Sequence, residues 1–219
     1  ETKLLHQFPK IINSDIELMS ENKAHIYGFF MGDGSSGSYN TKYGIKYQWY
    51  LCNQDKTVID ALKIKCEEVY NRPFKILNTL ESSHVYKLVP TKNTKPFVEE
   101  YRDRFYDSNK HKIIPSEILN GSTKMKESFW VGYYLADGCR SDTKNIGCHR
   151  FDIKGKISAL NMYYLVKSLG YNASINTRSD KMEIYRINYS TKKQRKNPII
   201  VKKIYKLDKT NDYVYDLET

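Results

Sequence analysis

The sequence predicts a mixed α/β protein built as a pseudo-twofold tandem repeat of two αββαββ halves. The first observation is an internal repeat: "IYGFFMGDG" (26–34) aligns without a gap with "WVGYYLADG" (130–138), at an offset of 137 − 33 = 104 residues. The second is that strand-like and helix-like runs follow each copy in the same order. The third is size, because 219 residues with 40% hydrophobic content suffice for one sizeable core or two small ones.

The elements after each copy justify this order. In the first half a Ser/Gly/Asn loop (35–44) precedes a strand (45–53), a helical run (58–69), the turn "NRP", a strand (84–90) and a further helix (94–106). In the second half the loop 140–147 precedes a strand (148–153), a helical run (157–169), the turn "GYN" and a strand (181–190). We therefore expect a lead-in segment (1–22), a first half (23–110), a linker (111–125), a second half (126–196) and a C-terminal tail (197–219).

Small residues recur four positions apart in both repeated helices. Gly28 and Gly32 share one helix face, and Gly132 and Ala136 hold the matching positions. Because glycine inside a helix costs about 1 kcal/mol relative to alanine, these positions indicate that the two helices pack closely, small face against small face. Aromatic neighbours would then fill the core of each half: Tyr27, Phe29, Phe30, Trp130, Tyr133 and Tyr134.

Both repeated helices end on an aspartate followed by glycine, so pairing the helices brings Asp33 and Asp137 side by side. A carboxylate is unfavourable at the negative end of a helix, and two neighbouring carboxylates repel each other. A divalent cation between them relieves both effects, and carboxylates with water and phosphate oxygens suit Mg²⁺. Such an ion beside a phosphodiester activates water and neutralises the leaving oxygen. An ordinary helix C-cap and turn is the alternative for one copy, whereas two copies in register favour the metal site.

The net charge of +11 and a pI near 9.3 indicate a phosphate-bearing partner. An A/T-rich coding sequence, which enriches Lys, Asn, Ile and Tyr, is the alternative source of this bias. No apolar run approaches the length of a membrane span, and the N-terminal stretch lacks the apolar region of a signal peptide. We expect an intracellular location and, since the sequence does not begin with Met, a piece of a longer protein. The four cysteines lack CxxC spacing, which favours free thiols over a zinc site built from Cys139, Cys148 and His149.

The two motifs together resemble the LAGLIDADG signature of homing endonucleases in their single-chain, two-motif form. The resemblance covers about residues 20–195 and implies that the signature helices form the interface between the two halves. It also implies that Asp33 and Asp137 bind the catalytic Mg²⁺, which Mn²⁺ can replace, with Gly32 and Ala136 in the same metal site. Met31 and Leu135 stand where the family has its first aspartate, a position that varies widely.

A second match lies in the linker, where "HKIIPSEI" resembles the "K-x-I-P" stretch of intein-borne members. It implies that Lys112, 137 − 112 = 25 residues before Asp137, assists the attacking water or the charged transition state. An ordinary solvated lysine is the alternative. The second half should supply a comparable base from "STKKQRKNP", where we choose Lys193, with Lys192 and Lys196 close behind. A plain phosphate-binding basic run is the alternative there.

The two ends of the chain resemble inteins as well. "DYVYDLET" (212–219) resembles the "VYDL" block near the end of inteins, and "FPKIINSDIELMS" (8–20) resembles the lead-in of intein-borne endonucleases. We therefore expect an endonuclease domain cut from, or encoded within, an intein.

Alternation along the strands predicts how the protein reads DNA. On 43–51, Tyr43, Ile45, Tyr47, Trp49 and Leu51 should pack on the helices, whereas Lys46, Gln48 and Tyr50 should face the major groove of a β-saddle. Arg150 and Asp152 share a face in the second half. Arg186 and Asn188 share theirs with Ile184, which leaves the direction of that face open. The remaining DNA-binding candidates are Arg140, Lys144, Lys192 and Lys196.

The sequence thus predicts a monomeric, site-specific endonuclease that cuts both strands of double-stranded DNA and does not bind membranes. An RNA-splicing maturase of the same fold is one alternative, and the intein-like ends argue against it. A catalytically inactive relic that only binds DNA is the other, and the presence of both aspartates argues against it.

Overall fold

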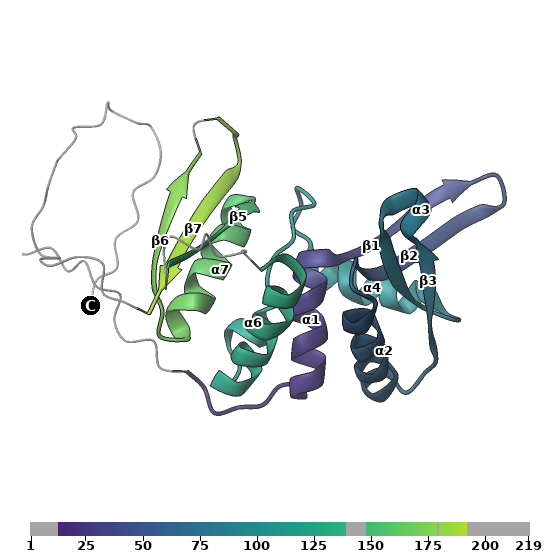
Figure 1. Cartoon of the computed structure of the whole chain (residues 1–219), viewed down its shortest axis with the longest axis horizontal. Helices are drawn as coiled ribbons and strands as arrows, with labels where there is room; N and C mark the ends of the chain where they lie inside the picture. The colour runs from purple at the N-terminus through teal and green to yellow at the C-terminus, as the bar shows by residue number, and fades with distance from the viewer. Residues whose placement is uncertain (1–12, 139–147, 179, 192–219) are drawn as a thin grey trace, which may run out of the picture. The chain divides into compact units, whose positions relative to one another are not determined.

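The computed structural model describes residues 13–138, 148–178 and 180–191 (Figure 1). All of them belong to one compact unit, Lys10–Lys193. None of the helices in these ranges is long and apolar enough to cross a membrane.

The first half contains a four-stranded antiparallel sheet in the order β1-β2-β4-β3, with helices packed on one of its faces. Its elements are α1 (Glu21–Asp33), β1 (Gly34–Thr41), β2 (Gly44–Asn53), α2 (Lys56–Tyr70), β3 (Phe74–Thr79), α3 (Leu80–Ser83), β4 (Val85–Pro90) and α4 (Thr94–Phe105). Trp49 and Leu51 of β2 and Leu88 of β4 form the buried face of the sheet.

The second half contains a three-stranded antiparallel sheet in the order β5-β7-β6. The elements from the linker onward are α5 (Ser116–Leu119), α6 (Thr123–Asp137), β5 (Cys148–Lys154), α7 (Lys156–Ser168), β6 (Asn172–Thr177) and β7 (Ile184–Ser190). Strand order β5-β7-β6 in this half matches β2-β4-β3 in the first half. Helix α6 comes before β5 along the chain, as α1 comes before β2. Helix α7 comes after β5, as α2 comes after β2. The predicted mixed α/β repeat is confirmed.

The segment expected as a Ser/Gly/Asn loop is instead strand β1. It pairs residue by residue with β2, from Gly34 opposite Leu51 to Thr41 opposite Gly44. The small, polar residues have little strand preference of their own, so the partner strand imposes the extended conformation. The β1–β2 hairpin also extends beyond the helices (Figure 1). Tyr43 and Ile45 at its tip are therefore exposed, at 87% and 59%, and the expectation that they pack on the helices is wrong.

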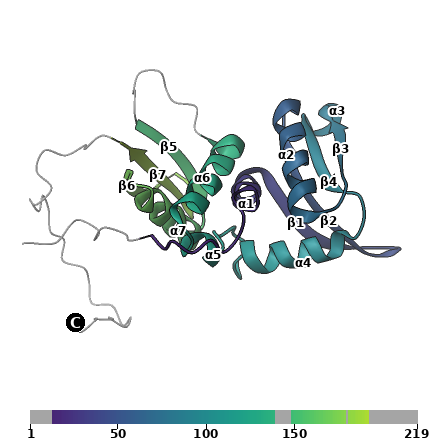
Figure 2. The same cartoon turned by 90° about the horizontal axis from the view of Figure 1, so that it is seen from below.

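Helices α1 and α6 lie side by side in both views (Figures 1 and 2). Each begins at a serine, Ser20 or Ser122, whose hydroxyl accepts a hydrogen bond from a backbone N–H in the first turn. A Cβ added to Gly28 would lie 1.8 Å from the Phe129 carbonyl oxygen, and one added to Gly132 would lie 2.1 Å from that of His25. The backbones of the two helices are thus in direct contact where the sequence places its glycines.

The outer faces of α1 and α6 are covered differently. The centre of the Phe30 ring of α1 lies 4.5 Å from the centre of the Tyr101 ring and 4.8 Å from that of Phe105, both on α4. Tyr134 holds the position on α6 that Phe30 holds on α1. It is 43% exposed, because no described helix covers that face of α6. The expectation that Tyr134 fills the core is therefore wrong, whereas the other five aromatic side chains named with it are buried.

Candidate active site at the ends of the paired helices

The last residues of α1 and α6 meet at one point of the molecule. A Cβ added to Gly32 would lie 2.6 Å from the Ala136 Cβ and 3.1 Å from the Asp137 Cβ, so the two helix ends are in contact. Asp33 and Asp137 are the final helical residues, and the N–H of the following glycine closes each helix on the carbonyl of Phe30 or Tyr134. The structure therefore brings together the two aspartates that the sequence predicts to be neighbours.

The surroundings of the two aspartates favour their protonated forms. Asp33 is partly buried, and desolvation, followed by the charge of Asp137, raises its pKa to about 6; Lys112 opposes this rise. Asp137 is more exposed, yet desolvation at the helix junction raises its pKa too, again against the opposing charge of Lys112. Each carboxylate ends its helix without a basic residue in the last turn, which leaves the local negative charge uncompensated within both helices.

Lys112 reaches this site from the segment between the halves. Its backbone forms an isolated antiparallel bridge with Tyr106, which follows α4. Its Nζ donates hydrogen bonds to four carbonyl oxygens around the end of α1: Phe30 at 2.8 Å, Met31 at 3.2 Å, Gly32 at 3.1 Å and Gly34 at 2.7 Å. Desolvation lowers the pKa of Lys112 to about 8, although Asp33 nearby favours its charged form. Lys112 is thus a cation at the negative end of α1 beside Asp33, and not a solvated surface lysine.

The two carboxylates suit a hard divalent cation that takes most of its other ligands from water and substrate. In the described ranges no three His, Cys, Asp or Glu side chains gather as a metal cluster, so Asp33 and Asp137 are the side-chain ligands available. Mg²⁺ binds in this way, through one or two carboxylates, water and phosphate oxygens. Gly32 and Ala136 line the junction, and the Gly32 carbonyl accepts from Lys112.

The predicted DNA-reading residues of the first half lie on the sheet face opposite the helices. Lys46 and Gln48 are exposed, and Tyr50 is partly buried. The Lys46 Nζ lies 5.8 Å from the centre of the Tyr39 ring. Lys87 of β4, which was not predicted, lies on the same face with its Nζ 5.0 Å from the Tyr50 ring. Alternation in "HVYKLVP" could have identified it, because the neighbouring Leu88 is buried.

The structure resolves the direction of the face in the second half. Arg186 and Asn188 of β7 pair with Asp152 and Arg150 of β5, whereas the alternating Phe151 and Ile187 are buried against the helices. The exposed face therefore carries all of the polar residues predicted there. Arg178, which follows β6, was not predicted and joins this face by donating to Asp152. Its position depends on a hairpin connection that no local pattern indicates.

Several predicted residues fall outside the ranges that the structure describes. They are the candidate base Lys193 and the DNA-binding candidates Arg140, Lys144, Lys192 and Lys196. Cys139 of the zinc alternative lies outside them too, and within them Cys52 and Cys66 are free thiols.

Comparison with known proteins gives two relatives by sequence. The chain is 56% identical over 223 residues to a DNA polymerase of Acanthamoeba polyphaga mimivirus, and the match covers all of this chain but 13% of that protein. It is 24% identical over 156 residues to a DNA polymerase of Thermococcus litoralis, covering 71% of this chain and 8% of that protein. No family model matches the sequence. The chain thus spans a small part of the curated relatives.

Comparison with solved structures gives the fold. Variants of the homing endonuclease I-DmoI superpose with a TM-score of 0.57 at 16% identity, covering 78% of this chain and 88% of theirs. I-DmoI in complex with DNA and Mn superposes with a TM-score of 0.56 at 17% identity, covering 78% of this chain and 89% of that one. The protein therefore has the fold of a LAGLIDADG homing endonuclease.

Proposed function

We propose that this chain is a site-specific endonuclease that cuts both strands of duplex DNA with a divalent metal, and that it belongs to an intein within a DNA polymerase. The observation that carries the proposal is the junction of α1 and α6, where two helices in backbone contact end together on Asp33 and Asp137. Desolvation raises the pKa of both carboxylates, so their charged forms are costly there, and a bound cation would offset that cost. The similarity to I-DmoI in fold supports the proposal.

In this proposal the chain's own residues position the substrate and compensate charge. Asp33 and Asp137 would hold the metal, which supplies activation of a water and neutralisation of the leaving oxygen. Each aspartate comes from a different half, so one chain presents two equivalent carboxylates to the two strands of a duplex, which fits action as a monomer. Lys112 keeps a positive charge beside Asp33, where it stabilises negative charge that develops on the phosphate.

The intein context rests on the two sequence relatives. Both are DNA polymerases much longer than this chain, and the match to the mimivirus protein extends along the whole of it. An endonuclease inserted in a polymerase gene accounts for this pattern together with the intein-like ends of the sequence. A maturase belongs to an intron, so a match inside coding sequence for a polymerase favours the intein.

Cleavage of the uninterrupted polymerase gene tests the proposal. We expect the full chain to linearise a plasmid that carries the host polymerase gene without its intein when Mg²⁺ is present, and to leave it intact with EDTA. Asp33→Asn and Asp137→Asn should each abolish linearisation while DNA affinity stays within about tenfold. Asp60→Asn is the matched control, because the Asp60 side chain is half-exposed on α2 and pairs with Lys56, and this variant should cut normally. Binding without cleavage by the unaltered chain would identify an inactive relic.

A further inference from the structure

The exposed face of the second sheet carries polar side chains in rows across its three strands. Arg186 lies on β7, the central strand, and its paired residues are Asp152 on β5 and Asn176 on β6. The next row along β7 consists of Asn188, Arg150 and Ser174. This is the face opposite the buried Phe151 and Ile187, so under the proposed function it faces the duplex.

Asp152 binds the guanidinium of Arg186 along one edge. The Arg186 Nε donates to Asp152 Oδ1 at 2.8 Å, and its Nη2 donates to Oδ2 at 3.1 Å. Both side chains keep about a third of their surface exposed, at 33% and 31%. The remaining edge, formed by Nη1 and the second hydrogen of Nη2, has no acceptor among the described residues. That edge offers two parallel N–H groups in a plane that Asp152 fixes.

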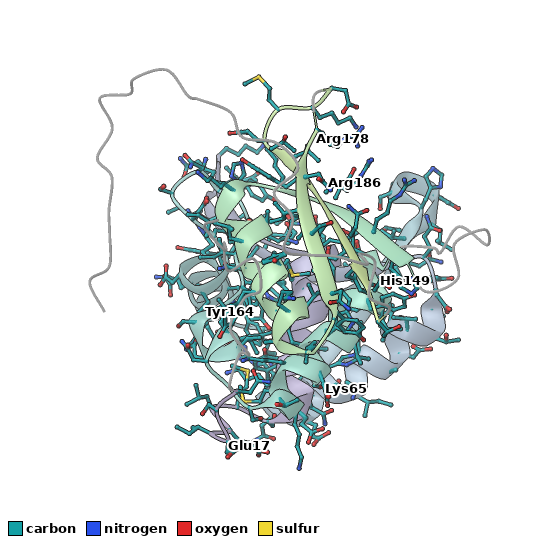
Figure 3. The ribbon with its side chains drawn as sticks, turned by 90° about the vertical axis from the view of Figure 1, so that its left-hand side faces the viewer. Glu17, Lys65, His149, Tyr164, Arg178 and Arg186 are labelled. Carbon is teal, nitrogen blue, oxygen red and sulfur yellow. The ribbon has the colours of Figure 1, made fainter. Side chains whose placement is uncertain are left out.

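A second arginine completes the cluster, and each of its three guanidinium nitrogens donates a hydrogen bond. Arg178 donates from Nη1 to Asp152 Oδ2 at 2.6 Å and from Nε to Asp180 Oδ1 at 2.9 Å, and its Nη2 also contacts Asp180. Figure 3 labels Arg178 and Arg186, which lie near each other at the end of the sheet where β6 and β7 join. Arg186 is therefore the arginine of the pair with a guanidinium nitrogen, Nη1, that has no acceptor among the described residues.

The charge of the cluster distinguishes it from the basic groups of the first half. Two arginines and two aspartates sum to zero, and a carboxylate at the centre of a DNA-facing surface disfavours phosphate. Lys46 and Lys87 instead lie over tyrosine rings and have no carboxylate partner among the described residues. The geometry and charge of the cluster thus suit contact with a base better than contact with the backbone.

We propose that Arg186 is a specificity-determining residue that reads one guanine of the target duplex, and that Asp152 positions it. The open edge of a fixed guanidinium pairs with the O6 and N7 acceptors that guanine presents in the major groove. No other base offers two acceptors side by side there. The inference rests on the proposed function, because it requires the sheet face to lie in the groove.

Selection from a library of randomised duplexes tests the inference, with the full chain in EDTA so that bound DNA stays intact. We expect the unaltered protein to enrich a consensus in which one guanine is preferred by roughly 10-fold or more. Arg186→Ala should abolish that preference at one position and leave the rest of the consensus. Arg186→Lys keeps the charge but removes the planar fork, so it should weaken the same preference while binding unselected DNA normally. Asp152→Asn should weaken the preference without weakening binding to unselected DNA.

Two controls separate base reading from loss of charge or of structure. Arg72→Ala also removes one arginine, but Arg72 stacks on Phe97 on the helix side of the first sheet, so the consensus should not change. Replacing the assigned guanine by 7-deazaguanine alters only the DNA. It should lower the DNA affinity of the unaltered protein by roughly 10-fold and leave the affinity of Arg186→Ala unchanged.

The outcomes separate this inference from the proposed function. An Arg186→Ala consensus identical to that of the unaltered protein overturns the role of Arg186, and so does indifference of every consensus guanine to 7-deaza substitution. Absence of any enriched sequence with the unaltered protein overturns the proposed function, and the inference with it.

Discussion

Asp33 binds its proton more tightly in the folded protein than in the unfolded chain, because desolvation and Asp137 raise its pKa from 3.8 to about 6. The free energy of unfolding should therefore fall as the pH rises from about 4 to about 6. Asp33→Asn removes this dependence, so we expect it to stabilise the metal-free protein at about pH 7 by on the order of 1–3 kcal/mol and to have little effect near pH 3.5. Urea unfolding in EDTA at several pH values measures the difference.

The matched variant for this experiment is Asp60→Asn, whose side chain is half-exposed on α2. It should change the free energy of unfolding little at any of these pH values. A metal-free Asp33→Asn protein less stable than the unaltered protein at about pH 7 would show that the site does not disfavour its carboxylate.

Added Mg²⁺ should reverse the order of stability. A cation that binds the folded state alone stabilises it by RT ln(1 + [L]/Kd), which is about 2.7 kcal/mol at a hundredfold excess over Kd. We expect Mg²⁺ to raise the Tm of the unaltered protein and to leave the Tm of Asp33→Asn and Asp137→Asn nearly constant. Equal rises in all three proteins would place the cation elsewhere.

Lys112 serves stability as well as the proposed chemistry, since its Nζ binds four carbonyl oxygens at the end of α1. Lys112→Met leaves those acceptors without this donor, so we expect a loss of about 1–3 kcal/mol in the free energy of unfolding. We also expect single-turnover cleavage at saturating DNA to fall by about 10²-fold or more, because a group acting in the transition state affects rate more than binding.

Measuring the rate at saturating DNA separates the effect of Lys112 on cleavage from its effect on stability. A variant that is merely less stable still cuts at the normal rate once folded and fully bound, below its unfolding temperature. A saturated rate within about twofold of the unaltered protein would therefore leave Lys112 a purely structural role. Partial activity in Lys112→Arg would indicate that charge, rather than a neutral amine, is what the reaction uses.

At the scale of elements, the contact of α1 with α6 leaves no room for a single methyl group. Gly28→Ala would bring its Cβ to 1.8 Å from a backbone oxygen of α6, and Gly132→Ala to 2.1 Å from one of α1. We expect each variant to lower the free energy of unfolding by at least about 2 kcal/mol, because backbone cannot yield as a side chain does. Thermal unfolding compares them with Gly37→Ala, whose Cβ meets nothing within 4 Å. Equal Tm values for all three variants would contradict the close packing.

The sequence was sufficient to predict this helix pair and insufficient to predict its sheets in detail. Gly28 and Gly132 identify the helix contact because a glycine inside a helix is destabilising unless a close approach of another backbone requires it. Strand β1 could not be predicted, because its serines and glycines become extended through pairing with β2 rather than through their own preference. Ile45 alternates with the buried Trp49 and Leu51 of β2, but alternation carries no information on how far the helices extend beneath a hairpin, and both Tyr43 and Ile45 are exposed.

At the candidate site, the residues that could be predicted follow from sequence patterns, whereas the contacts that were missed depend on the folded structure. Asp33 and Asp137 follow from an internal repeat, and Lys112 from a family resemblance. The four carbonyl oxygens that Lys112 binds lie 78 to 82 residues away along the chain, and that contact depends on the folded path of the linker. The pairing of Asp152 with Arg178 likewise depends on how β6 and β7 are joined, which is a property of the folded sheet.

At the scale of the whole molecule, the net charge of +11 should appear as a strong salt dependence of DNA binding. Each phosphate contact releases counterions and contributes about −0.9 to the slope of log K against log salt, so a protein lying along a duplex should give a slope of roughly −4 or steeper. Binding of the full chain to duplex DNA over a range of KCl concentrations measures this slope. A nearly flat titration would argue against a nucleic-acid function.

The two halves should contribute unequally to that slope, because their exposed faces differ in how their charges are paired. Lys46 and Lys87 have no carboxylate partner among the described residues and are free to neutralise phosphate, so Lys46→Ala and Lys87→Ala should each make the slope shallower by up to about 0.9. Arg186 is already paired with Asp152, so Arg186→Ala should weaken binding to the selected sequence while leaving the slope nearly unchanged. A loss of slope in Arg186→Ala equal to that in Lys46→Ala would mean that Arg186 contacts phosphate, and base reading in the second half would have to come from its neighbours on β7.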